Sequence, residues 1–151
     1  MVFITRFIGE YFFLSNFYKC DMQIDYGGYI GRITTPTVEH AYQAMKCVRE
    51  EDKLNILNAP TPSIAKDIGR KVELIDNWDS KKLVVMQILL VNKFIVGDND
   101  LFFRLRNTKD ATLIEGNYWH DNYWGRCFCS KCCGKGENHL GKLLMELRDD
   151  K

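Results

Sequence analysis

The segment Asn77–Val96 constrains the fold more than any other part of the chain. Its apolar residues recur at the three- and four-residue spacing of a helix, and Gly97 follows as a stop signal. We therefore predict a helix here whose core-facing residues are Leu83, Met86, Leu90 and Phe94. A chain of 151 residues can build a hydrophobic core around this helix without help from metals or disulfides.

Two threonine–proline pairs mark the starts of further helices. Each pair offers a capping hydroxyl and a proline whose fixed φ suits the first helical turn. Thr35-Pro36 predicts a helix that runs to about Arg49. Thr61-Pro62 predicts one that ends near Gly69.

Polar residues precede two more helical segments near the C-terminus. Asp98 or Asn99 is expected to cap a short helix through Arg106. Asn138 is expected to cap the final helix, which turns four leucines to the core: Leu140, Leu143, Leu144 and Leu147.

Alternating apolar and polar residues predict a small antiparallel sheet near the N-terminus. Its strands are Phe3–Phe7, Met22–Ile24 and Tyr29–Ile33, and the last two flank a turn at Tyr26-Gly27-Gly28. No repeat, linker or low-complexity tract divides residues 1–151. We therefore predict a single α+β domain that is mostly helical.

The charge balance excludes a protein that is drawn to duplex DNA by its overall field. The chain has 21 Lys and Arg against 20 Asp and Glu, so any contact with nucleic acid has to be local. The N-terminus lacks the pattern of a secretory signal, and the longest apolar run is about half of the ~20 residues that a membrane span needs. We expect a cytoplasmic protein with reduced thiols and no membrane partner.

A polar stripe on the helix expected after Pro36 has the residue types of a catalytic cleft. Spacings of four and three place Glu39, Gln43 and Lys46 on one face. A carboxylate near an amide and an amine can move protons and hold a sugar, but a solvated helix face carries the same pattern. Glu39-His40 begins like a zinc-protease helix, yet the second histidine of that motif is missing, which excludes such a metal site.

Two segments are unusually aromatic. Asn117–Gly125 holds four aromatic residues, a histidine and an acid. This suits either a pocket that stacks a base and activates a water or an aromatic plug that closes the core. Phe12–Tyr18 is too aromatic for a solvent loop and is expected to pack against the core or a ligand.

Glycines precede the last predicted helix. In Gly134–Asn138, exposed backbone N–H groups and the helix dipole favour an anion such as phosphate, although such glycines also make ordinary turns. The spacing of a Walker loop is absent.

Four of the six cysteines crowd into seven residues: Cys127, Cys129, Cys132 and Cys133. They include one C-x-x-C pair, and His120 or His139 would complete a tetrahedral zinc site. Reduced free thiols, or a disulfide or redox role, are open alternatives because the distant second pair of a zinc ribbon is absent.

Several segments together resemble the NADAR (YbiA-like) family, in the order in which that family has them and over essentially the whole chain. They are Leu14–Phe17, Thr37–Lys46, the helix start Asn77–Asp79, Asp121–Gly125 and Gly136–Arg148. The resemblance implies the fold of that family and N-glycosidase activity.

The resemblance also implies a substrate in which C1 of a ribose is attached to an exocyclic amine of a base. Removal of ADP-ribose from guanine, in nucleic acid or in a nucleotide, is the leading expectation, with an ADP-ribosyltransferase as functional counterpart. The alternatives are hydrolysis of ribosylamino-pyrimidine phosphates of riboflavin biosynthesis and a non-catalytic module that binds ADP-ribose or a related nucleotide.

Carried over position by position, the resemblance implies roles for individual residues. Glu39 is the leading carboxylate and Asp121 the second acid near the ribose. Lys46 either forms a Schiff base with C1 of an opened sugar, or binds phosphate and orients Glu39. Trp78 stacks on the base. The other implied substrate-binding residues are Asn16, Phe17, Gln43, Tyr123, Trp124, Gly136 and Asn138.

The resemblance implies neither a catalytic metal nor an organic cofactor. The chain departs from the family's usual pattern where the cysteine cluster replaces a short glycine-containing link before the last helix. A structural zinc ion held by Cys127, Cys129, Cys132 and Cys133 would either gate the cleft or only stabilise the fold.

Overall fold

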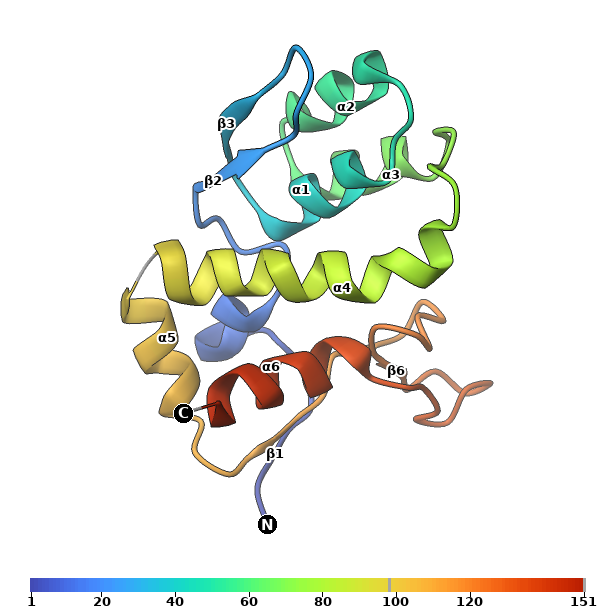
Figure 1. Ribbon diagram of the computed structural model, residues 1–151. Helices are drawn as coiled ribbons and strands as arrows, with labels where there is room; N and C mark the ends of the chain where they lie inside the picture. The colour runs from blue at the N-terminus through green and yellow to red at the C-terminus, as the bar shows by residue number, and fades with distance from the viewer. Residues whose placement is uncertain (98, 151) are drawn as a thin grey trace. The chain divides into compact units, whose positions relative to one another are not determined.

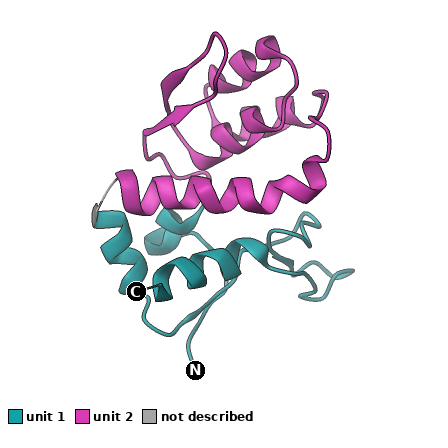
Figure 2. Ribbon diagram, viewed as in Figure 1, with its two compact units in different colours: residues 1–15, 99–151 teal, residues 16–98 magenta. Residues whose placement is uncertain are grey.

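The computed structural model describes residues 1–97 and 99–150 (Figure 1). Figure 2 shows the two compact units into which the chain divides. Unit 1 comprises Met1–Ser15 and Asn99–Lys151, and unit 2 comprises Asn16–Asp98. Helices and three two-stranded sheets make this an α+β fold, as predicted. Within the described ranges, no helix has both the length and the apolar character that crossing a bilayer requires.

Unit 2 is built around α1 (Val38–Met45). This helix packs against α2 (Glu50–Leu57), α3 (Pro62–Gly69) and α4 (Trp78–Val91). The buried apolar side chains of these helices are Val38, Ala41, Tyr42, Ala44, Ile56, Ala65, Trp78, Met86, Leu89 and Leu90. The apolar spacing therefore identified Met86 and Leu90 as core residues, but Leu83 is only half-buried and the buried Leu89 was not predicted.

The start and the end of α1 differ from the prediction. Thr37, not Thr35, is the capping residue, and its Oγ1 accepts a hydrogen bond from the backbone N–H of His40 at 3.1 Å. Thr35 instead ends strand β3, where its hydroxyl pairs with the Tyr26 hydroxyl at 2.6 Å. The helix stops at Met45, and α2 follows as a separate helix that the sequence analysis did not predict.

The predictions for α3 and α4 are confirmed. Thr61 caps α3 by accepting a hydrogen bond from Ile64 N–H at 3.2 Å. α4 continues directly into the π-helix η2 (Asn92–Gly97), so that Gly97 ends the helical segment. The wider π-helical turn places both Lys93 and Phe94 in the interior, whereas the regular spacing predicted only the phenylalanine.

The predicted hairpin is present in unit 2, but the third strand does not join it. β2 (Met22–Asp25) pairs in antiparallel register with β3 (Arg32–Thr35). The expected strand at Phe3–Phe7 is shorter and lies in unit 1, where β1 (Phe3–Ile4) pairs in parallel with β4 (Thr112–Leu113). A parallel partner more than a hundred residues along the chain leaves no signal in local alternation.

Unit 1 also contains a second parallel pair, formed by β5 (Gly116–Asn117) and β6 (Arg126–Cys127). Its helical elements are η1 (Gly9–Leu14), α5 (Asn99–Arg106) and α6 (His139–Asp149). α6 packs against β4 and α5.

The expected caps of the two C-terminal helices have different outcomes. Asp98 and the side chain of Asn99 lie outside the described part of the structure. Asn138 precedes α6 as expected, but it makes no side-chain capping bond. Its Nδ2 donates to the carbonyl of Leu113 at 2.9 Å and its Oδ1 accepts from Glu115 N–H at 3.0 Å. Asn138 therefore ties the start of α6 to the chain at β4.

Candidate active site

Glu39 and Gln43 lie one turn apart on α1 and are joined by a hydrogen bond. Nε2 of Gln43 donates to Oε1 of Glu39 at 2.8 Å. The backbone N–H of Glu39 donates to the carbonyl of Asn16 at 3.0 Å. The Glu39 and Gln43 residues are only 7% and 5% exposed. The solvated-face interpretation is therefore wrong for this part of the stripe, because a buried carboxylate with an amide donor has a specific environment.

Two amide oxygens beside this arrangement are buried and accept no hydrogen bond from any described residue: Asn16 Oδ1 and Gln43 Oε1. The other end of the Asn16 side chain donates to the sulfur of Met86 at 3.6 Å. Buried polar atoms in folded proteins nearly always have partners. These oxygens therefore suit the hydroxyl or amino donors of a bound molecule, such as a sugar or an amine on a base.

Lys46 is the C-cap residue of α1 and is half-buried. Burial lowers the pKa of its ammonium group, and the nearby positive charge of Arg70 lowers that pKa further. The negative charge of Glu39 acts in the opposite direction without cancelling the effect. Lys46 is therefore easier to deprotonate than an exposed lysine, which is the condition for a nucleophilic amine.

His40, also on α1, has a structural role. Its Nε2 donates to the carbonyl of Ala59 at 2.9 Å, so Nδ1 accepts from the Thr37 hydroxyl at 2.8 Å. Both ring nitrogens are thus engaged by the protein. This agrees with the exclusion of a metal site at Glu39-His40 from the sequence.

The two aromatic residues assigned to substrate binding in unit 2 have different environments. Trp78 is 6% exposed, and its ring lies 5.3 Å from that of Tyr42 between centroids, at 53°. Phe17 is half-buried, with the Lys66 ammonium group 6.0 Å from its ring centroid. Stacking of a base on Trp78 remains a prediction, and it requires the indole to gain an open face.

Asp121 lies in unit 1, in a turn that its own carboxylate closes. Oδ1 accepts from the backbone N–H groups of Tyr123 at 3.2 Å and Trp124 at 2.9 Å. These bonds fix the position of the carboxylate relative to the aromatic loop. The catalytic role of Asp121 remains a prediction.

Asn117, which was not among the predicted site residues, organises this loop. Its Oδ1 accepts from the backbone N–H groups of Trp119 and Asp121 at 3.2 and 3.1 Å. Its Nδ2 donates to the carbonyls of Asp121 at 2.8 Å and Arg126 at 3.2 Å. The usable sequence signal was an asparagine at the start of the aromatic segment, because this side chain commonly holds turns by such bonds.

The aromatic loop has two half-buried and two exposed aromatic side chains, so it neither only closes the core nor only faces solvent. Tyr123 packs edge-on against Trp124 with ring centroids 4.8 Å apart and also contacts the His139 ring at 4.4 Å. Tyr118 and Trp119 are 53% and 57% exposed. The guanidinium of Arg6 lies 5.3 Å from the ring centroid of Tyr118, while Tyr123 and Trp124 are half-buried.

The backbone at the start of α6 is not free to bind an anion. The N–H groups of residues 137–140 donate to the carbonyls of residues 122–125, at 2.7 to 3.2 Å. The expectation of exposed N–H groups here is therefore wrong. A Cβ at Gly136 would collide with the backbone of Gly125 and Arg126, so close chain packing explains this glycine without a ligand.

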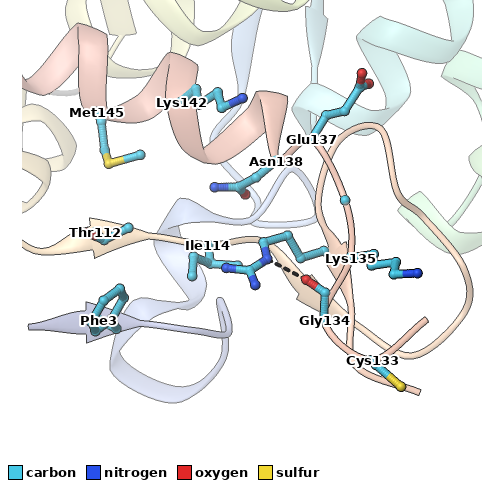
Figure 3. Close-up of a pocket in the computed structure, with 12 residues that line it drawn as sticks. Phe3, Thr112, Ile114, Cys133, Gly134, Lys135, Glu137, Asn138, Lys142 and Met145 are labelled. Atoms are coloured by element: carbon cyan, nitrogen blue, oxygen red, sulfur yellow. Dashed lines mark hydrogen bonds between the residues drawn. The ribbon is translucent and has the colours of Figure 1, made fainter. Parts of the chain in front are cut away.

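Gly136 and Asn138 nevertheless line an open groove of about 600 Å³ in unit 1. Figure 3 shows Lys135 and Lys142 at this groove, with Glu137 and Asn138 between them along the chain. Arg126 contributes a third cation and is held by a 2.6 Å hydrogen bond from its Nε to the carbonyl of Gly134. Binding of phosphate at this groove would therefore depend on side-chain cations.

Three of the four clustered cysteines gather around a histidine in unit 1. The potential ligand atoms of His120, Cys127, Cys129 and Cys132 all lie within 4.8 Å of one another. Cys133 is not part of this group, since its thiol donates to the carbonyl of Ser130 at 3.2 Å. The geometry therefore favours a set in which His120 completes the site, one of the two histidines considered from the sequence, over the set of four cysteines.

The predicted site residues are divided between the two units. Unit 2 brings Asn16, Glu39, Gln43 and Lys46 together around α1 and also contains Phe17 and Trp78. Unit 1 contains Asp121, Tyr123, Trp124, Gly136 and Asn138. The buried carboxylate and amide of unit 2, together with the half-buried amine of Lys46, form the candidate catalytic centre, since they place a proton carrier near a potential nucleophile on one helix.

Comparison with known proteins gives consistent matches over nearly the whole chain. The N-glycosidase YbiA of Escherichia coli (strain K12) is 37% identical over 142 residues, which cover 93% of this chain and 81% of that protein. The Zea mays protein named riboflavin biosynthesis protein PYRR, chloroplastic, is 35% identical over 150 residues, or 90% of this chain and 23% of that protein. The NMR structure of E. coli YbiA matches with a TM-score of 0.77 at 34% identity and covers 99% of this chain and 85% of that chain.

The family assignment rests on both sequence and fold. The sequence model of the NADAR domain matches residues 2–150. This range includes the α1 cluster, the aromatic loop and the start of α6. The resemblance inferred from the sequence motifs is therefore confirmed: this chain belongs to the NADAR domain family.

Proposed function

We propose that the protein removes ADP-ribose from guanine by hydrolysing the bond between ribose C1 and the exocyclic amine of the base. The similarity of the chain to proteins named N-glycosidases shows that it is a hydrolase of N-glycosyl bonds. The proposal concerns the identity of its substrate. The observation that carries it is the buried Glu39–Gln43 pair on the same helix face as Lys46.

The donors and acceptors of this cluster suit a ribosylated amine. The buried oxygens of Asn16 and Gln43 would accept hydrogen bonds from ribose hydroxyls or from the exocyclic N–H. Glu39 would carry the proton that the reaction moves. Binding of a sugar here would give partners to polar atoms that have none within the described residues.

The lowered pKa of Lys46 supports a route through a Schiff base. The lone pair of the glycosidic nitrogen forms C1=N as the bond between C1 and the ring oxygen breaks, and Glu39 supplies a proton to that oxygen. The neutral Lys46 amine adds to C1 and gives up a proton to the departing guanine amine, which leaves as the C1–nitrogen bond breaks. Water then hydrolyses the lysine imine and releases ADP-ribose.

Two features of unit 1 support a substrate that includes nucleic acid. Tyr118 and Trp119 are exposed aromatic residues, with the Arg6 cation over the Tyr118 ring, and Lys135 and Lys142 line the groove. A net charge of +1 requires such contacts to be local.

The likeness to PYRR favours a second candidate substrate. That protein is named for riboflavin biosynthesis, and this chain matches it over 150 residues. The candidate reaction is hydrolysis of a ribosylamino-pyrimidine phosphate, which has the same bond between ribose C1 and an exocyclic amine. Its product is ribose 5-phosphate instead of ADP-ribose.

The test is a direct comparison of substrates. The protein is incubated with an oligonucleotide ADP-ribosylated on guanine, with an ADP-ribosylated guanine nucleotide and with a ribosylamino-pyrimidine phosphate. We expect release of ADP-ribose from the first two at rates well above the buffer control. Turnover of only the third would replace the proposal with the second candidate, and binding of ADP-ribose without any product would indicate a non-catalytic module.

The Schiff base is tested by trapping with borohydride during turnover. We expect mass spectrometry to find the reduced sugar attached at Lys46, and no adduct in Lys46→Arg, because an arginine does not form this imine. Lys71→Arg is the matched control, since Lys71 is exposed. Full activity of wild type without any trapped adduct would instead favour direct hydrolysis.

A further inference from the structure

The His120 imidazole lies close to three cysteine thiols in unit 1. Its Nδ1 is 3.3 Å from Sγ of Cys132, 3.5 Å from Sγ of Cys129 and 4.0 Å from Sγ of Cys127. The chain spacing is His-x₆-Cys-x-Cys-x₂-Cys, so a loop and a hairpin supply the ligands together. Such convergence of four soft or borderline ligand atoms has no role in the proposed hydrolysis.

These separations match the edges of a tetrahedral zinc site. With Zn–S near 2.3 Å and Zn–N near 2.0 Å, a tetrahedron has sulfur–nitrogen edges of about 3.5 Å and sulfur–sulfur edges of about 3.8 Å. The three observed nitrogen–sulfur distances lie within about 0.5 Å of the sulfur–nitrogen edge. All four ligand atoms lie within 4.8 Å of one another, so binding of an ion would draw the thiols together by up to about 1 Å.

The backbone around the thiols provides the outer hydrogen bonds that such sites use. The N–H of His120 donates to Sγ of Cys127 at 3.4 Å, and the N–H of Cys132 donates to Sγ of Cys129 at 3.4 Å. The side-chain amide of Asn122 lies 3.7 Å from Sγ of Cys132. Donors aimed at sulfur stabilise the thiolate form and orient the ligands.

A tight hairpin holds the three cysteines. Cys127 N–H donates to the carbonyl of Lys135 at 2.9 Å, and Gly134 N–H donates to the carbonyl of Cys127 at 2.7 Å. Cys133 N–H donates to the carbonyl of Cys129 at 2.9 Å, which closes the turn between them. The turn directs the exposed Cys133 thiol toward Ser130, away from the ligand group.

We propose that His120, Cys127, Cys129 and Cys132 bind one zinc ion through Nδ1 and three thiolates. Binding releases the three thiol protons to solvent, and no electron transfer is involved. With four protein ligands, the coordination sphere is full, so the ion has a structural role. It joins the aromatic loop Asn117–Gly125, which supplies His120, to the hairpin formed by residues 127–135.

Metal analysis of the purified protein tests the site. The reduced wild-type chain is exposed to zinc, freed of excess metal and measured by elemental analysis. We expect one zinc ion per chain, and loss of this zinc in Cys129→Ser, Cys132→Ser and His120→Asn. Asparagine is chosen because position 120 has φ +68°, a conformation that asparagine tolerates. Cys133→Ser is the matched control and keeps its zinc.

Spectroscopy provides a readout that does not depend on variant folding. Cobalt bound to wild type is expected to show the thiolate charge-transfer and ligand-field bands of a tetrahedral site. Chelation should speed hydrogen exchange over residues 117–134 more than over α6. Reduced wild type without stoichiometric zinc, equal zinc loss in Cys133→Ser, or an iron chromophore in its place would each overturn the proposal.

Discussion

Gly69, at the end of α3, lies directly against the side chain of Gln43 on α1: a Cβ at position 69 would stand 2.7 Å from the Gln43 carboxamide carbon. The absence of a side chain at position 69 therefore keeps Gln43 in reach of Glu39. Two helices are thus needed to position one hydrogen bond.

Gly69→Ala is expected to reduce activity without unfolding the protein. The new methyl group displaces the Gln43 carboxamide from Glu39, and misplacement on the scale of an ångström costs on the order of a hundredfold in rate. Alanine has a higher helix propensity than glycine by about 1 kcal/mol, which opposes the steric cost in stability. The measurements are kcat and urea denaturation. If Gly69→Ala retained wild-type kcat, the importance of the Gln43 position would be disproved.

Glu39→Gln should lower kcat by about a hundredfold or more, with a smaller change in KM. The variant keeps a carbonyl oxygen that can accept from Gln43, so the packing of α1 is preserved. It removes only the group that carries the proton. Glu73→Gln, at an exposed position, is the control and should leave both constants unchanged. Full activity of the double variant Glu39→Gln, Asp121→Asn would exclude both carboxylates from catalysis.

The rate of borohydride trapping should rise with pH to a midpoint below 10.5. That value is the ordinary pKa of lysine, and burial together with Arg70 lowers the pKa of Lys46. Only the neutral amine attacks C1, so the rising limb follows deprotonation of this residue. Trapping at a series of pH values measures the midpoint. A midpoint at or above 10.5 would contradict the assignment.

Asn138→Asp should destabilise the protein by about 2 to 3 kcal/mol. The aspartate cannot donate to the buried carbonyl of Leu113, and its negative charge would face that carbonyl. The free energy of unfolding from urea titration measures the effect. Asn107→Asp is the matched control at an exposed position and should change stability by less than about 0.5 kcal/mol.

Tyr26 should make stability fall between pH 10 and 12. Burial raises the pKa of its phenol from 10.0 to about 12, although the hydrogen bond with Thr35 opposes this rise. Above pH 10 the unfolded chain loses the proton while the folded protein keeps it, so a stabilisation of at most about 2 to 3 kcal/mol is progressively lost. Unfolding titrations should show a weaker pH dependence of stability in Tyr26→Phe than in wild type. Tyr29→Phe should keep the wild-type pH dependence, because Tyr29 is fully exposed.

Local sequence signals predicted the elements that depend on local contacts. Thr61-Pro62 and Gly69 mark α3, and the apolar spacing marks α4. The leucine spacing marks α6, although Leu147 is only half-buried, unlike the other three predicted leucines. The prediction missed α2, because its eight residues bury only Ile56 and carry little periodic apolar signal. It also placed the α1 cap at Thr35, since a threonine before proline and one after it offer the same hydroxyl.

The sequence identified the candidate residues, but it did not show whether their side chains are buried or exposed to solvent. The spacing on α1 put Glu39, Gln43 and Lys46 on one face, but it could not distinguish a buried cluster from a solvated one. Burial depends on neighbours from other elements, such as Asn16 and the end of α3. The choice of His120 over Cys133 likewise depends on how a turn directs each side chain.

The amino-acid sequence by itself determined the α+β class, the positions of the main helices, the family and the residue types available for chemistry, because periodicity, capping and motif order are properties of neighbouring residues. Only the tertiary structure decided the parallel strand pairs, the inward rotation of Lys93 and the unsatisfied oxygens of Asn16 and Gln43. Each of these follows from contacts between segments that are distant in the chain, or from a helical turn whose hydrogen bonds depart from the regular pattern.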